Sequence, residues 1–286
     1  MEDAVRDTKI VAIGNQKGGV GKSTLAVHLA RGLAERGRKS LIVDLDENAG
    51  TTHHFGIDGD AFYGTFELML GAEDAEVVTM TNDPVDGVWL PEHVDIIPCN
   101  RKISNIDTAL RDHAKMRNPH EALSEPLRAL HGKYDYIFLD TAPNSNTPTV
   151  AAYKAAEYFL LAAIPDPFSI RGLNDALADI DDAQKHGNQN LILLGVVLLA
   201  VRERTRLAQE LLDYVEKTFT PEGGVSRKFN TMIGHSTVLP AAQKLGKTIF
   251  ETEPEHKITE QFRELVKEFE VRIGELSRPR EEALNA

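Results

Sequence analysis

The chain has 286 residues, 42% of them hydrophobic and 27% charged, which is ordinary for a soluble globular protein. Its formal net charge of −12 argues against a protein that coats nucleic acid uniformly, although a local basic patch remains compatible with it. The one cysteine, Cys99, excludes an intramolecular disulfide and any cluster that needs several thiolates from one chain. The acidic residues 1–7 do not resemble a signal peptide, and the longest apolar run, 191–201, is too short to span a bilayer.

The first motif along the chain is a glycine-rich loop that follows a strand-like run, 9–13, and precedes a helical pattern. Phosphate-binding loops require this order, because backbone N–H groups and the helix dipole together cradle an anion. Lys22 is expected to reach the β- and γ-phosphates, and the Ser23 hydroxyl to bind Mg²⁺. The residues expected to bind a nucleoside triphosphate are Gly18, Gly19, Val20, Gly21, Lys22, Ser23 and Thr24.

This loop departs from the general pattern at two positions. Gln16 stands where glycine is usual, six residues before Lys22, and Lys17 is an additional lysine. The alternative interpretation is a glycine-rich turn with solvated lysines, which the flanking strand and helix disfavour.

Two acidic residues close apolar strands, Asp44 at the end of Ser40–Asp44 and Asp140 at the end of 134–140. In a doubly wound sheet both carboxylates reach the same edge as the glycine loop. Mg²⁺ with its waters is the natural partner for such an acid, so Asp140 is predicted to hold the metal. The alternative for Asp140 is a cap of the next helix. Asp46 shares a face with Asp44 and is a candidate secondary contact to water or metal.

Residues 51–91 are rich in glycine and read as a helix-containing excursion from the sheet edge. The adjacent His53 and His54 have no nearby cysteine and no helical i, i+4 partner. Both histidines are therefore predicted to lie on the surface and not to form a metal site.

Strand-like and helical segments alternate through the rest of the chain, which predicts a doubly wound, mostly parallel α/β sheet flanked by helices in a single domain, 1–286. Residues 255–276 form an amphipathic helix with a mixed-charge polar face, which favours packing on the core over a membrane surface. Residues 1–7 and 277–286 are predicted to be frayed tails. Further predicted strands are Val94–Ile97, 158–164 and 191–199, and the clearest internal helices are 171–185 and 205–217.

Residues 17–24, 44–46 and 137–143 resemble the deviant Walker A, Walker A′ and Walker B segments of the ParA/MinD ATPases. The similarity continues in later segments and covers nearly the whole chain after residue 8. It is greatest to the short, Soj-type ParA partition ATPases, in a form without an N-terminal DNA-reading domain. The resemblance implies a P-loop NTPase fold with ATP and Mg²⁺ as cofactors.

The same resemblance implies roles for single residues. Lys17 would cross the interface of an ATP-sandwich homodimer to the partner's phosphates, like an arginine finger, whose effect is worth ~10³–10⁵ in rate. Lys22 would act in cis, Thr24 would lie near the α-phosphate, and Asp44 would position or polarise the attacking water. Hydrolysis is expected to be slow until a ParB-like centromere-binding adaptor completes the site. Glu47 departs from the family's usual proline and adds a negative charge near the triphosphate.

The resemblance further implies nonspecific DNA binding by the ATP-bound dimer, in the cytoplasm on the nucleoid. Arg204 matches a DNA-contacting arginine of the family, and Arg202 and Arg206 lie beside it. A few arginines doubled by dimerisation can neutralise DNA phosphates. Val238 occupies a position that is basic in relatives, and the alternative for the arginines is a solvated helix start.

Two other classes of function compete with DNA partition. A MinD-like membrane-cycling ATPase is disfavoured by the mixed charge of the C-terminal helix, so no stable membrane association is expected. A reductase similar to the nitrogenase iron protein is disfavoured by the lone Cys99, because that family's cluster takes two cysteines from each subunit.

Overall fold

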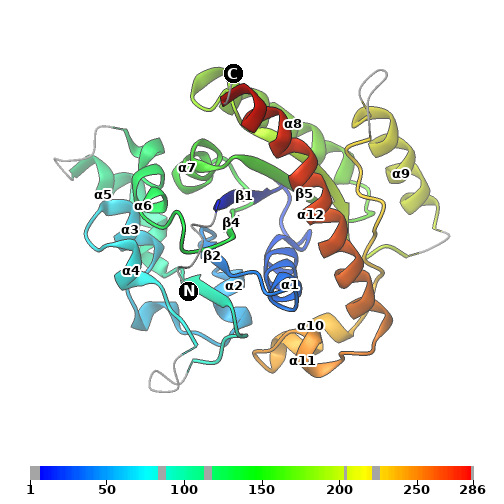
Figure 1. The fold of residues 1–286 in the computed structure, drawn as a ribbon, viewed down its shortest axis with the longest axis horizontal. Helices are drawn as coiled ribbons and strands as arrows, with labels where there is room; N and C mark the ends of the chain where they lie inside the picture. Colours follow the sequence, from blue (N-terminus) through cyan, green and yellow to red (C-terminus); the bar gives the residue numbers. More distant parts are fainter. Residues whose placement is uncertain (1–6, 83–87, 113–117, 203–204, 221–225, 285–286) are drawn as a thin grey trace.

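Six parallel strands form one sheet in the order β3-β2-β4-β1-β5-β6, with helices on both faces (Figure 1). The structure is a computed structural model that describes residues 7–82, 88–112, 118–202, 205–220 and 226–284. The predicted doubly wound parallel sheet is confirmed. Its strands are β1 (Lys9–Gly14), β2 (Ser40–Asp44), β3 (Val94–Ile97), β4 (Tyr136–Asp140), β5 (Tyr158–Ala163) and β6 (Ile192–Leu198).

Side chains alternate across the sheet and divide the core into two layers. Val11 and Ile13 of β1 belong to one buried cluster, together with residues of α1 and α12, whereas Ile10 and Ala12 belong to the other. Because both faces are covered, these strands are apolar nearly throughout. The longer helices are α1 (Lys22–Ala34), α7 (Thr147–Ala155), α8 (Ser169–His186), α9 (Arg206–Thr218) and α12 (Lys257–Leu284).

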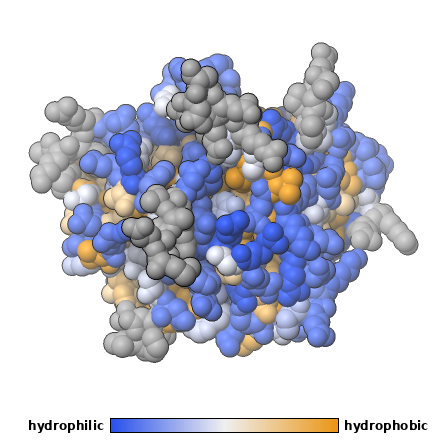
Figure 2. Space-filling model, viewed as in Figure 1, coloured by the Kyte–Doolittle hydropathy of each residue, from blue (hydrophilic) through white to orange (hydrophobic). Residues whose placement is uncertain are grey.

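Shorter helices fill the loops. The predicted excursion after β2 is confirmed, since it holds α2 (Gly50–His54), α3 (Thr65–Leu70), α4 (Ala75–Val78) and a 3₁₀ turn at Gly59–Ala61. Figure 2 shows that the visible face is mostly hydrophilic, with small separate apolar patches. The remaining helices are α5 (Ile106–Asp112), α6 (Ser124–Arg128), α10 (Val238–Lys244) and α11 (Ile249–Thr252), with 3₁₀ turns at Arg101–Asn105 and Pro119–Glu121.

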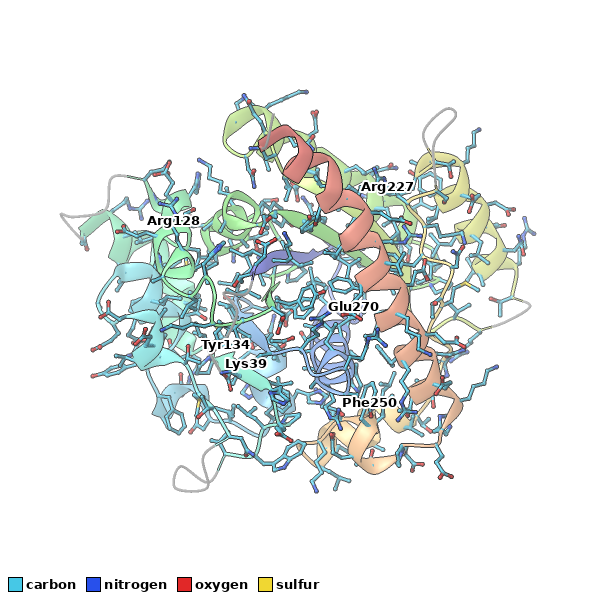
Figure 3. The ribbon with its side chains drawn as sticks, viewed as in Figure 1. Lys39, Arg128, Tyr134, Arg227, Phe250 and Glu270 are labelled. Carbon is cyan, nitrogen blue, oxygen red and sulfur yellow. The ribbon has the colours of Figure 1, made fainter. Side chains whose placement is uncertain are left out.

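The C-terminal helix α12 lies along α1, and α11 packs beside both. Phe250 of α11, labelled in Figure 3, is buried and has the guanidinium groups of Arg31 and Arg263 at 5.3 and 5.5 Å from its ring centroid. The predicted apolar stripe of α12 is fully buried, which confirms that this helix packs on the core. The stripe consists of Ile258, Phe262, Leu265, Val266, Phe269 and Ile273.

The helix α12 continues to Leu284, so the prediction of a frayed tail from residue 277 does not hold for this stretch. Ser277 is buried, and its hydroxyl lies 2.8 Å from the Tyr158 hydroxyl and donates to the Ile273 carbonyl at 2.8 Å. The Ser277 side chain is thus held against Tyr158 of β5, beyond the end of the apolar stripe. Residues 1–6 lie outside the described part. No helix among the described residues is long and apolar enough to span a membrane.

Candidate active site at the carboxyl edge of the sheet

The glycine loop between β1 and α1 uses backbone conformations that favour glycine. Gly19 and Gly21 have φ angles of 72° and 88°, in the left-handed region. A Cβ atom on Gly21 would also lie 2.8 Å from Cδ1 of Leu199. Helix α1 begins at Lys22, immediately after this turn, so its unpaired N–H groups face the loop.

Asn15 connects the loop to the neighbouring strand. Its Nδ2 donates to the carbonyl of Ala162 at 2.7 Å, and its Oδ1 accepts from the backbone N–H of Lys17 at 2.9 Å. The ammonium of Lys22 donates to the Asn15 carbonyl at 3.4 Å, and the residue as a whole is 6% exposed. Burial lowers the pKa of Lys22, while the carboxylates of Asp140 and Asp46 act in the opposite direction.

The two loop lysines lie in different environments. Lys17 forms an ion pair with Asp166, in the loop between β5 and α8, and its side chain is 24% exposed. Helix α8 lies so close to the loop here that a Cβ on its Gly172 would be 2.8 Å from Oδ1 of Asn15. Lys22 is therefore enclosed beneath the loop, and Lys17 is held at its outer side.

The two strand-end acids are fully buried and lie in register on adjacent strands. Asp44 of β2 pairs with Asp140 of β4, and the N–H of Leu45 donates to the Asp140 carbonyl at 2.9 Å. Burial raises the pKa of Asp44, and the charge of Asp140 adds to that rise. Burial also raises the pKa of Asp140, whereas the hydroxyls of Ser23 and Thr51 oppose it.

Asp140 and Ser23 fit a divalent cation. Oδ2 of Asp140 accepts from Thr51 at 2.7 Å, but its buried Oδ1 has no hydrogen-bond partner among the described residues. Gly50 backs the Ser23 hydroxyl so closely that a Cβ there would lie 2.5 Å from Oγ. A free carboxylate oxygen beside a serine hydroxyl is a donor set that Mg²⁺ accepts, so the predicted metal residues are brought together.

Comparisons with known proteins connect this arrangement to a family. The AAA domain family model matches residues 8–193. The chromosome-partitioning ATPase Soj of Thermus thermophilus is 31% identical over 266 residues, which is 93% of this chain and 96% of that protein. The chain belongs to the ParA/MinD superfamily of ATPases. The sporulation initiation inhibitor protein Soj of Bacillus subtilis is 29% identical to this ParA-type chain, over 91% of it and 97% of that protein.

A solved structure has the same fold as this ParA-type ATPase. It is cobyrinic acid a,c-diamide synthase from Mycobacterium smegmatis with bound ATP analog and magnesium, with a TM-score of 0.74 and 24% identity, covering 91% of this chain and 93% of that one. The predicted family, fold and ATPase class are thus confirmed. ATP and Mg²⁺ are the nucleotide and the metal that the residues of this ParA-type chain fit.

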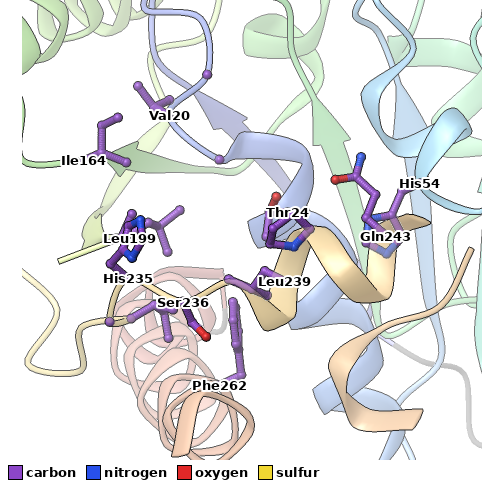
Figure 4. A pocket seen from close by; sticks show the side chains of 16 residues that line it. Val20, Thr24, His54, Ile164, Leu199, His235, Ser236, Leu239, Gln243 and Phe262 are labelled. Carbon is purple, nitrogen blue, oxygen red and sulfur yellow. The ribbon is translucent and has the colours of Figure 1, made fainter. Parts of the chain in front are cut away.

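A cavity of about 280 Å³ adjoins the glycine loop on the side of α10 (Figure 4). Val20 and Thr24 line it from the loop and α1, Leu199 from the end of β6, and Leu239 from α10. Its lining is mainly apolar, and its volume lies near the lower limit of small-molecule sites, ~300 Å³. This cavity could not be predicted from the sequence, because its walls come from segments that are distant along the chain.

The prediction that His53 and His54 both lie on the surface is wrong for His54. It is 2% exposed, lines the cavity and bonds through Nε2 to the Lys247 carbonyl at 3.1 Å, whereas only His53 is on the surface. Its ring centroid lies 5.7 Å from that of His28. Burial lowers the pKa of His28 to about 3 and that of His54 to about 4, so both rings are neutral and pack in the core.

The predicted DNA-contacting arginines are only partly described. Arg202 is exposed, and its Nη2 lies 3.2 Å from Nε2 of His235, which lines the cavity. Arg206 is exposed at the start of α9 and bonds to Glu210 at 2.7 Å. Arg204 lies outside the described residues.

Proposed function

We propose that this ATPase binds Mg-ATP at the glycine loop, forms an ATP-sandwich homodimer, and binds DNA nonspecifically. In this proposal the dimer drives segregation or positioning of plasmid or chromosome DNA, and a ParB-like adaptor stimulates slow hydrolysis. The similarity to the chromosome-partitioning ATPase Soj of Thermus thermophilus supports the partition role. We treat residues 1–286 as one domain, cytoplasmic and associated with the nucleoid.

The roles within one subunit follow from the site. The N–H groups of Gly18, Gly19, Val20 and Gly21 face the phosphates, with Thr24 near the α-phosphate and Lys22 beneath the β- and γ-phosphates. Ser23 and Asp140 would hold Mg²⁺, which when bound neutralises charge on the phosphate oxygens. Asp44 positions the attacking water. The cavity beside Thr24 takes the nucleotide base, because it is mainly apolar and Gly19, Val20 and Gly21 of the loop line it.

The proposed dimer rests on one observation, the position of the Lys17 side chain at the outer side of the phosphate loop of its own subunit. Lys22 already occupies the buried position there, whereas Lys17 lies at the outer side, partly exposed and paired with Asp166. A cation at that place is available to a second subunit's triphosphate. Supplied in trans, it would stabilise the charge that develops during phosphoryl transfer.

The DNA surface is proposed at the start of α9. Arg202, Arg204 and Arg206 are doubled in a dimer, and phosphate neutralisation needs no base contacts. The Glu210 carboxylate beside Arg206 opposes DNA phosphates, so this surface is weaker than three free arginines. Because binding depends on the neutralisation of phosphates, DNA affinity is expected to fall steeply with salt concentration.

The test is retention on immobilised nonspecific DNA with ATP, with ADP and without nucleotide, beside sedimentation with anionic phospholipid vesicles. We expect retention on DNA with ATP only, lost by Arg206→Glu and increased by Glu210→Gln. ATP-dependent sedimentation with vesicles, without DNA binding at low salt, would favour a membrane-cycling ATPase instead.

A further inference from the structure

The short helix α2 lies against both buried acids. Two successive residues each hold one oxygen of one carboxylate. Thr51 Oγ donates to Oδ2 of Asp140 at 2.7 Å, and the N–H and Oγ of Thr52 donate to Oδ2 of Asp44 at 2.8 and 2.7 Å. Both threonines are fully buried, so water does not replace these bonds. The helix therefore constrains the acids that the chemistry uses.

The direction of the Thr52 hydroxyl bond is determined by a third group. The backbone N–H of Cys99 donates to Thr52 Oγ at 2.9 Å. An N–H group can only donate, so the hydroxyl accepts from Cys99 and its own hydrogen is directed to Asp44. The hydrogen bonds therefore run in one direction, from Cys99 to Thr52 and from Thr52 to the Asp44 carboxylate.

The second carboxylate oxygen of Asp44 is held less firmly. Among the residues that the structure describes, Oδ1 accepts only from the N–H of Asp46, at 3.2 Å. The two bonds from Thr52 on Oδ2 thus set the rotation of the carboxylate and leave Oδ1 the oxygen more available to another donor, such as a water.

The other end of α2 is anchored in the core, so Thr52 has a defined place. His54 bonds to the Lys247 carbonyl, and its ring packs edge to face on His28. Nδ1 of His28 in turn forms a hydrogen bond of 2.8 Å with the carbonyl oxygen of Thr24, in the first turn of α1. A shift of α2 relative to α1 would disrupt these buried contacts.

We propose that Thr52 is a positioning residue for ATP hydrolysis, which acts through Asp44 by holding its carboxylate in the orientation that aligns the attacking water. This inference rests on the proposed function, because Asp44 has a water to align only if the chain hydrolyses ATP. Among the described residues, the hydroxyl of Thr52 forms hydrogen bonds with Asp44 and Cys99 and none with the nucleotide loop or its lysines. Its loss should affect the chemical step and leave ground-state binding of ATP intact.

The test compares Thr52→Val, which keeps the branched shape and removes the hydroxyl, with Thr52→Ser, which keeps the hydroxyl. For Thr52→Val we expect kcat to fall by about 10- to 100-fold, the effect of a small misplacement of a reacting group. The Kd for ATP, measured with a fluorescent analogue, should stay within about twofold if only the chemical step is affected. Thr52→Ser should recover most of kcat.

Thr65→Val is the matched control. Thr65 is also fully buried, and its hydroxyl donates to Asp44 at 2.7 Å, but to the backbone carbonyl instead of the carboxylate. Both valine variants should lower the urea midpoint of unfolding to a similar extent. Only Thr52→Val should lower kcat strongly.

Three results would overturn the inference: wild-type kcat in Thr52→Val, equal losses of kcat in the two valine variants, or no recovery in Thr52→Ser. If the wild type hydrolyses ATP and Asp44→Ala does not, any of these three results overturns only the role of Thr52 and leaves the proposed function standing. If the wild type binds ATP but never hydrolyses it, the proposed function fails as well.

Discussion

The ammonium of Lys17 forms an ion pair with the carboxylate of Asp166 in the same chain. The backbone N–H of Lys17 is also held, by Oδ1 of Asn15 at 2.9 Å. A lysine in this position must leave Asp166 before it can reach the phosphates of another subunit. The ion pair therefore opposes the dimer that we propose.

The first prediction concerns Asp166→Asn, which removes the charge and keeps the size of the side chain. Dimerisation with ATP should strengthen by about two- to fivefold, because a partly exposed pair contributes up to about 1 kcal/mol. Light scattering over a range of protein concentrations measures this. Asp175→Asn is the control, since Asp175 pairs with Arg171 at 3.8 Å on the same helix, α8. Unchanged or weaker dimerisation in Asp166→Asn would contradict the proposed restraint on Lys17.

The second prediction concerns Gly50→Ala. The added Cβ would lie 2.5 Å from Ser23 Oγ and displace that hydroxyl. Affinity for ATP should fall at least about tenfold with Mg²⁺ and much less with EDTA, because we propose that Ser23 binds the metal. Gly274→Ala is the control, since a Cβ there meets nothing within 4 Å. Equal affinity of Gly50→Ala and wild type for Mg-ATP would show that Ser23 is not a metal ligand.

The third prediction concerns pH. The folded chain keeps His28 and His54 neutral, with pKa values of about 3 and about 4, whereas the unfolded chain protonates both below the ordinary value of 6.5. At these two residues the unfolded state then binds more protons, so their contribution to stability is greatest above pH 6.5 and is lost as the pH decreases toward 4. The raised pKa values of Asp44 and Asp140 act in the opposite direction, so the histidine contribution is taken from the difference between variants. Each histidine contributes about 1.4 kcal/mol per pH unit to this slope.

Urea unfolding at pH 7.5, 6 and 5 measures the slope. His54→Gln should reduce it, whereas His53→Gln, a change in the exposed neighbour, should leave it unchanged. An identical slope in His54→Gln and wild type would mean that His54 is charged in the folded state.

Much of the fold and the nucleotide loop could be predicted because the signals are local. Apolar runs that end in Asp44 and Asp140 specify buried parallel strands, and the topology then brings their ends to the glycine loop. The partners of these residues could not be predicted. Asp166 lies in a loop and Thr52 on the short helix α2, and the course of both segments depends on tertiary packing.

Two predictions were wrong for related reasons. His54 was expected on the surface because no nearby cysteine or helical i, i+4 partner suggested a metal site. Its neutral ring is instead buried beside Phe55 and His28, with one nitrogen bonded to the Lys247 carbonyl. Residues 277–286 were expected to be a frayed tail, whereas α12 runs to Leu284. In both cases the structure shows a polar contact to a residue far along the chain, Lys247 for His54 and Tyr158 for Ser277.

The mass of Asp44→Ala in solution tests the central claim most directly. This variant lacks the carboxylate that positions water, so it should bind ATP without consuming it. Light scattering should give twice the monomer mass with ATP, and the monomer mass with ADP or without nucleotide. A variant that retains bound ATP and yet remains a monomer at every protein concentration would contradict the ATP-sandwich dimer.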